Sequence, residues 1–125
     1  VDDVAMNRLL LRQILKLEYP HALMTEAEDG LAALQAINNE GFDLVFMDMV
    51  MPQMDGIEAS KSIRSTVDRQ GQRLPILGLS ANVNSSDRER FIDAGADDFL
   101  LKPYDRQTLV EVTERLLFTA QQTVQ

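Results

Sequence analysis

Five stretches of the chain carry apolar residues at steps of three and four, the spacing that places them along one face of a helix. Proline or glycine marks the end of two of these stretches, because Pro20 follows the first and Gly41 follows the second. The pattern therefore predicts five amphipathic helices, over residues 6–17, 31–37, 57–67, 85–94 and 105–116.

Three shorter runs differ from the helical stretches because they are apolar at nearly every position. Residues 42–48, 74–80 and 99–102 are too short for a helix and too uniform for a half-exposed strand. Such runs are typical of parallel strands that are buried on both faces of a sheet. A further segment at residues 22–26, just before the turn at Asp29, predicts another strand.

Strands that alternate with helices at this spacing predict an α/β fold with right-handed crossovers and a parallel sheet covered on both faces. In such sheets the ligand site lies beyond the carboxyl ends of the strands. Those ends carry Asp48, Ser80 and Lys102. Three unlike polar groups at three strand ends are a more specific signal than any one of them alone.

Two more acids, Asp2 and Asp3, precede the first predicted helix at the same kind of position. A divalent cation lets clustered carboxylates all stay ionised, and Mg²⁺ prefers such oxygen ligands and shares them with phosphate. A carboxylate such as Asp48 also acts as a nucleophile that forms an acyl phosphate. Lys102 would then bring a mobile positive charge to the phosphoryl oxygens, and the Ser80 hydroxyl would donate to one of them.

Each of these residues has a simpler explanation when it is taken alone. An Asp at a strand end is more often a helix cap, a Lys before Pro is more often a solvated turn residue, and a Ser there satisfies backbone groups. Phe99 is equally well explained as a core aromatic. The functional interpretation depends on the strand ends being brought together.

Composition narrows the choice of function. The formal charge of −8, from 20 acidic and 12 basic residues, disfavours direct binding of nucleic acid. Without cysteine the chain has neither disulfides nor thiolate metal sites. No apolar run approaches the roughly 20 residues of a membrane span. We therefore expect a cytoplasmic domain without membrane contact of its own, while a parent protein is free to be anchored in the inner membrane.

The order and spacing of these residues resemble the receiver domains of two-component response regulators over essentially the whole chain. The matching segments are Asp2-Asp3, Met47-Asp48, Met51 to Gly56, Leu79-Ser80-Ala81, Ala94 to Asp97 and Phe99 to Pro103. The resemblance implies one receiver domain over residues 1–125 and a flavodoxin-like (CheY-like) doubly wound fold. Such a fold has five helices and five parallel strands in the order 2-1-3-4-5.

The resemblance also implies a role for each site residue. Asp48 is the phosphoacceptor, and Asp2, Asp3 and Asp48 hold Mg²⁺ together with the backbone carbonyl of Val50, with Mn²⁺ as an alternative metal. Lys102 takes the place of the family's lysine, whereas Ser80 and Phe99 take the switch positions. The bond before Pro103 is expected to be cis, as the family usually has it.

The implied activity is phosphorelay signal transduction. A histidine kinase or a histidine-phosphotransfer domain donates the phosphoryl group, and the first helix is the expected docking site. The chain catalyses its own phosphorylation and dephosphorylation, and phosphorylation switches the face formed by the fourth helix, the last strand and the last helix. Residues 51–59 and 79–82 look most like receivers of hybrid sensor histidine kinases.

One departure from the family concerns the first strand. Receivers place an apolar strand before the acidic pair, in the centre of the sheet, whereas this sequence starts at Val1. We therefore expect a receiver that is truncated at its amino end and lacks nearly all of this strand. Dimerisation or strand exchange with another chain would be one way to fill the gap.

Other classes of protein fit less well. A haloacid-dehalogenase-type phosphotransferase needs a second acid two residues beyond its nucleophile, and Val50 stands there. A pseudo-receiver, which binds partners without phosphorylation, typically lacks an acid or the lysine. A nucleotide-binding protein would need a glycine-rich phosphate loop, and neither common form occurs. Labelling with acetyl phosphate and Mg²⁺, lost in Asp48→Asn, separates these classes.

Overall fold

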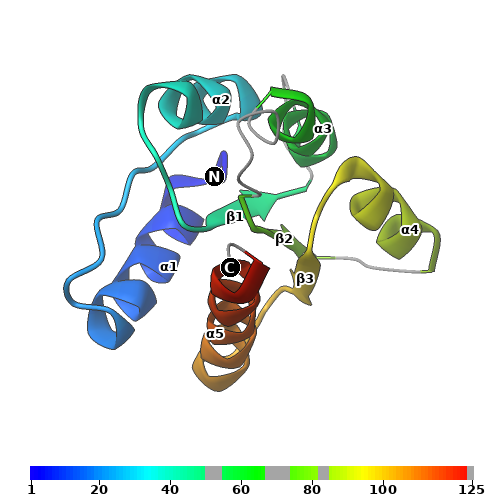
Figure 1. The fold of residues 1–125 in the computed structure, drawn as a ribbon. Coiled ribbons are helices and arrows are strands. Elements are labelled where there is room, and N and C mark those ends of the chain that lie inside the picture. Colours follow the sequence, from blue (N-terminus) through cyan, green and yellow to red (C-terminus); the bar gives the residue numbers. More distant parts are fainter. Residues whose placement is uncertain (50–54, 67–73, 82–84, 124–125) are drawn as a thin grey trace.

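Figure 1 shows the computed structural model of the chain, in which a parallel sheet lies between two layers of helices. The structure describes residues 1–49, 55–66, 74–81 and 85–123. Its helices are α1 (Ala5–Glu18), α2 (Gly30–Asn39), α3 (Gly56–Thr66), α4 (Ser85–Ala94) and α5 (Arg106–Thr123). Its strands are β1 (Val45–Asp48), β2 (Ile76–Ser80) and β3 (Asp98–Leu101). The five predicted helices and the three uniform apolar runs are thus confirmed.

β2 is the middle strand of the sheet and pairs in parallel with β1 and with β3. Helices α1 and α5 cover one face, and α2 and α3 cover the other (Figure 1). Because water reaches neither face, all five residues of β2 are buried. The register sets Asp48 level with Leu79 and Ser80 level with Leu101, so the three strands end at the same edge.

Two clusters of buried side chains fill the space between the sheet and the helices. The cluster under α2 and α3 includes Ala33, Met47, Met49, Ile63, Ile76 and Phe91. The cluster under α5 includes Leu77, Leu79, Leu100, Leu109, Val112 and Leu116. Successive residues of a strand point to opposite faces, so both clusters draw on the same strands. The inward face predicted for the last helix is confirmed.

The prediction of a strand at residues 22–26 is wrong, because these residues form no strand in the structure. The described part of the chain contains three strands, in the order β1-β2-β3, whereas four were expected, namely the family's five without the first. A strand needs a hydrogen-bonded neighbour, and the Asp2 amide donates at 3.1 Å to the carbonyl of Ala27, just after this stretch. Val1 bonds to β1 on this side: its nitrogen donates to the Phe46 carbonyl, and its carbonyl accepts from the Asp48 amide.

Helix α1 begins and ends close to the predicted residues, but it is less buried than its apolar stripe predicted. Along its whole described length no residue is fully buried, and Met6, Leu10 and Leu17 remain more than half exposed. Among the described residues no helix is both long enough and apolar enough to cross a membrane.

Candidate functional site

The site lies at the carboxyl edge of the sheet, where the predicted strand ends come together. Asp48 ends β1, Ser80 ends β2 and Lys102 follows β3. The Lys102 amide donates to the Ser80 carbonyl at 2.7 Å, which ties the last two strand ends to each other. The peptide bond between Lys102 and Pro103 is cis, as expected from the resemblance.

Three carboxylates gather at this edge. Each of Asp2, Asp3 and Asp48 places a carboxylate oxygen within 4.8 Å of the others. Asp2 and Asp48 are buried, whereas Asp3 is exposed. The cluster therefore has two sheltered members and one that reaches solvent, which leaves an open side for a ligand.

Lys102 brings a positive charge to the buried carboxylates. Its Nζ donates to Asp2 Oδ2 at 3.0 Å and lies 3.6 Å from Asp48 Oδ2. Burial alone would raise the pKa of Asp2, but hydrogen bonds from the Val4 amide and from Lys102 outweigh it. The pKa of Asp2 therefore lies below its usual value, and the carboxylate stays ionised.

Val1 fixes the acidic pair to the sheet, a role that sequence reasoning missed. Its ammonium nitrogen donates to the Phe46 carbonyl at 2.6 Å, and the Asp48 amide donates to the Val1 carbonyl at 2.9 Å. Asp2 and Asp48 thus hold their relative positions through a single shared residue.

Gly56 is a second positioning residue whose role was not recognised from the sequence. A Cβ built at Gly56 would lie 2.2 Å from the Asp48 carbonyl oxygen and 2.6 Å from Met49 Cα. The amino end of α3 therefore packs directly on the backbone that carries Asp48. The signal was present in the sequence, since a glycine opens this helix, but only the fold reveals what the missing side chain makes room for.

The two expected switch residues lie on neighbouring strands, with Ser80 at the end of β2 and Phe99 within β3. Ser80 is buried at 4% exposure, and Phe99 is half-buried. The Phe99 ring packs edge-on against Phe91, with centroids 6.5 Å apart, and the Arg88 guanidinium lies 4.9 Å from its centroid. Arg88 was not anticipated, because a residue on α4 gives no sequence signal of contact with a strand.

The residues present fit a magnesium ion. The cluster offers only carboxylate oxygens. These hard ligands suit Mg²⁺ better than they suit softer metals. The exposed Asp3 leaves room for water and phosphate oxygens, which Mg²⁺ usually retains as ligands. Val50, the expected carbonyl ligand, lies outside the described residues.

Relatives with known sequences point to one family. The family model for the response regulator receiver domain matches residues 1–114. The sensor histidine kinase GacS of Pseudomonas protegens is 39% identical over 113 residues, which are 90% of this chain and 12% of that protein. The two-component response regulator ORR41 of Oryza sativa is 39% identical over 111 residues, 87% of this chain and 84% of that protein. The chain therefore spans only a small part of the GacS kinase.

Solved structures agree as well. The receiver domain of sensor histidine kinase PA1611 from Pseudomonas aeruginosa, described with a magnesium ion in its active site cleft, superimposes with a TM-score of 0.82 at 30% identity, over 94% of this chain and 93% of that one. The chemotaxis protein CheY4 of Vibrio cholerae gives 0.81 at 27% identity, over 92% of each chain. The chain belongs to the response regulator receiver domain family, whose members serve two-component phosphorelays through aspartate phosphorylation and magnesium binding.

Proposed function

We propose that Asp48 of this chain accepts a phosphoryl group from a phosphohistidine donor. The observation that supports this most strongly is the cluster of Asp2, Asp3 and Asp48, whose carboxylate oxygens lie within 4.8 Å of one another beside the Lys102 ammonium. A receiver does little covalent chemistry beyond supplying the nucleophile, so positioning and charge neutralisation carry the reaction.

In the proposed step, an Asp48 carboxylate oxygen attacks the donor phosphorus while the bond from phosphorus to the imidazole nitrogen breaks. The nitrogen keeps the bonding electron pair and takes a proton from solvent, and Asp48 becomes an acyl phosphate. Asp2, Asp3 and Asp48 would hold Mg²⁺, which would supply positive charge near the phosphoryl oxygens when bound. Mn²⁺ uses the same oxygen ligands and would substitute for it.

Lys102 would follow the charge as it moves. Its ammonium bonds to Asp2 at 3.0 Å and lies 3.6 Å from Asp48, so a small movement brings it onto a phosphoryl oxygen. The flexible lysine side chain permits this movement. A charge-assisted hydrogen bond to the acyl phosphate would then hold β1 and the end of β3 together.

The switch would follow from the added charge, about −1.5 to −2 units. The phosphoryl oxygens would draw the Ser80 hydroxyl toward Asp48, and the Phe99 ring would turn into the space that Ser80 leaves. That turn would take Phe99 away from the Arg88 guanidinium, which now lies 4.9 Å from its centroid. The face formed by α4, β3 and α5 would change with it.

We further propose that the donor docks on α1. This helix starts just after Asp3, and the side chains of Met6, Leu9 and Leu10 are 46–59% exposed on it. Exposed apolar side chains beside a charged site are typical of a docking surface for a protein rather than for a small molecule. The net charge of −8 favours a protein as the binding partner and disfavours nucleic acid.

The parent protein remains a proposal of its own. Identity of 39% to the GacS sensor kinase supports a receiver within a hybrid kinase. Response regulators named MprA from Mycobacterium are 40% identical over 116 residues, with this chain spanning 47% of their length, and they support a receiver joined to an output domain instead.

The central test is labelling with acetyl phosphate. With Mg²⁺ present, we expect intact-mass measurement to show the gain of one phosphoryl group, and we expect Asp48→Asn to abolish it. Asp43→Asn is the matched control, because Asp43 is exposed and lies just before β1, at the end of that strand away from Asp48. A phosphoryl group that persists in Asp48→Asn would overturn the assignment of the nucleophile.

Docking on α1 has a separate test. We expect Leu10→Asp to slow transfer from a phosphorylated histidine-phosphotransfer protein by about tenfold, because a charge replaces an apolar contact. Labelling by acetyl phosphate should stay unchanged, since that donor needs no docking surface. Equal slowing with both donors would mean that the substitution damages the site and not the docking.

A further inference from the structure

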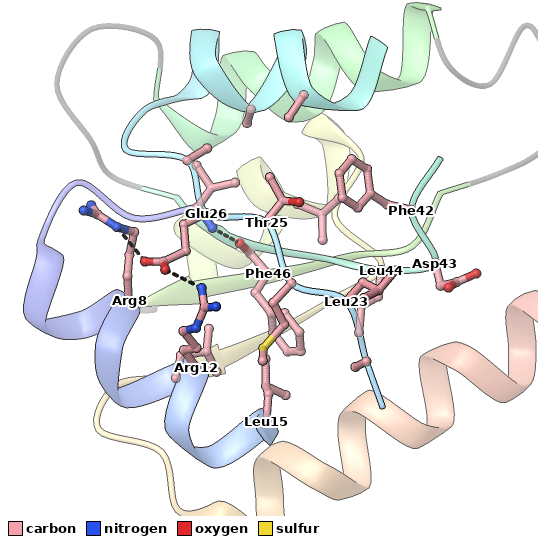
Figure 2. Close-up of a pocket in the computed structure, with 18 of the residues that line it drawn as sticks. Arg8, Arg12, Leu15, Leu23, Thr25, Glu26, Phe42, Asp43, Leu44 and Phe46 are labelled. Carbon is pink, nitrogen blue, oxygen red and sulfur yellow. Dashed lines mark hydrogen bonds and ion pairs between the residues drawn. The ribbon is translucent and has the colours of Figure 1, made fainter. Parts of the chain in front are cut away.

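The peptide that joins Asp48 to Met49 is held from both sides of β1. On the side of β2, the Met49 amide donates to the Leu79 carbonyl at 3.0 Å. On the other side, where the Asp48 amide donates to the Val1 carbonyl at 2.9 Å, β1 borders a groove of about 1190 Å³. Figure 2 shows the walls of this groove, which come from α1, residues 21–27 and residues 41–46. Hydrogen bonds to two different segments thus hold the backbone around Asp48.

The Met49 side chain is wholly buried against β2. Its exposed fraction is 0%, and it belongs to the cluster under α2 and α3. Gly78, a buried residue of β2, leaves the space in which this side chain lies. A Cβ built at Gly78 would stand 3.1 Å from both Cγ and Sδ of Met49, which is closer than such atoms ordinarily pack. Glycine in a strand interior weakens the strand and often marks such a close approach.

Gly56 makes a second close approach to the same pair of residues. A Cβ there would lie 2.6 Å from Met49 Cα and 2.2 Å from the Asp48 carbonyl oxygen. The start of α3 therefore lies against the backbone of Met49, while β2 lies against its side chain. A side chain packed this closely has little free volume to move into, so a displacement of Met49 reaches the peptide that it shares with Asp48.

We propose that Met49 is a positioning residue for Asp48, and that the absence of a side chain at Gly78 sets the place of Met49. This inference rests on the proposed function, because it names a residue that aims the nucleophile of that reaction. The Cα atoms of Asp48 and Met49 are joined by one peptide, about 3.8 Å apart. A displacement of about 1 Å at a reacting group costs roughly 100-fold in rate, so a few tenths of an ångström cost severalfold.

Gly78→Ala tests this proposal. Alanine loses less backbone entropy on folding than glycine, which offsets the crowding, so we expect the unfolding midpoint to stay within about 3 °C. The added methyl group would displace Met49, and we expect labelling of the full chain by acetyl phosphate with Mg²⁺ to slow about fourfold. A time course of intact-mass spectra measures the rate.

Ile76→Val is the matched control in the same strand. Ile76 is also wholly buried in the cluster under α2 and α3, but it lies level with Val45, at the end of β1 away from Asp48. The smaller side chain should lower the unfolding midpoint, yet we expect the labelling rate to stay within about 1.5-fold. Equal slowing in Ile76→Val and Gly78→Ala would overturn the proposal, because a loosened core would then explain both.

Met49→Ala completes a double-mutant cycle. It removes Cγ and Sδ, the two atoms that a Cβ at position 78 would meet. In the Met49→Ala background we expect Gly78→Ala to change the rate by less than about 1.5-fold, because the methyl group then displaces nothing. Slowing of the same size in both backgrounds would overturn the proposal, since Gly78 would then act on the sheet and not through Met49.

The carboxyl carbon of Asp48 gives a reading that needs no phosphoryl donor. In NMR spectra of the full chain, we expect Gly78→Ala to shift this signal more than it shifts the carboxyl signal of Asp43, which is exposed before β1. This reading and the Ile76→Val control decide the proposal even where Met49→Ala does not fold. An unlabelled parent chain would refute the function proposed for Asp48 alone, whereas an unmoved Asp48 signal in Gly78→Ala would overturn the role of Met49.

Discussion

The two sides of β1 differ sharply. On one side, the strand pairs with β2 over four residues, from Val45 to Asp48. On the other side, its hydrogen bonds go to Val1, and a groove of about 1190 Å³ takes up the rest of its length. Asp48 belongs to both sides, because it pairs with β2 and also donates its amide to Val1.

This difference divides the site into two halves. Asp48, Ser80 and Lys102 extend from strands that pair with one another, and the middle strand is buried throughout, so the sheet holds them in place. Asp2 and Asp3 follow Val1, which bonds to β1, and the Asp2 amide donates to the Ala27 carbonyl. We conclude that the sheet holds Asp48 directly, whereas Asp2 and Asp3 reach Asp48 through the hydrogen bonds of Val1.

The largest expected effect compares the two ends of the β1 segment. Gly56→Ala would place a Cβ 2.2 Å from the Asp48 carbonyl oxygen, whereas a Cβ at Gly41 meets nothing within 4 Å. We expect Gly56→Ala to lower the free energy of unfolding by about 3 kcal/mol and Gly41→Ala to change it by less than about 0.5 kcal/mol. Urea denaturation measures both, and equal effects would contradict the close packing of α3 on Asp48.

The next effect compares neighbouring amides of the same strand. The Met47 amide faces β2 and the Phe46 amide faces the groove, as the bonds of Val45 and Met49 to the β2 side imply. We expect Phe46 to exchange its amide hydrogen at least about 100-fold faster than Met47. Hydrogen exchange followed by NMR measures the two rates, and similar rates would mean that the groove side of β1 is protected after all.

The smallest effect compares cations within the site. Lys102→Met removes the ammonium that lies 3.0 Å from Asp2 and 3.6 Å from Asp48. We expect it to slow labelling by acetyl phosphate about tenfold and to strengthen Mg²⁺ binding severalfold, because one positive charge no longer competes for the carboxylates. Calorimetric titration measures the affinity, with Lys61→Met as a control on exposed α3 surface. Weaker Mg²⁺ binding in Lys102→Met would show that the lysine orders the cluster and does not compete for it.

Much of the site could be predicted because its residues lie at strand ends. Asp48, Ser80 and Lys102 each follow an apolar run, and parallel strands that end at one edge bring such residues together. Arg88 and Gly56 could not be assigned in the same way. The contact of Arg88 with Phe99 depends on how α4 packs, and the role of Gly56 depends on which backbone passes beside it.

The sequence by itself determined the five helices, the three buried strands and the edge at which the charged residues meet, because periodicity and parallel pairing are local or repetitive properties. It could not determine how residues 22–26 are held, and the strand predicted there does not form in the structure. A strand exists only with a neighbour, and whether a neighbour is present is a property of the tertiary structure. Only that structure decided that Val1 bonds across to β1 and carries the acidic pair to Asp48.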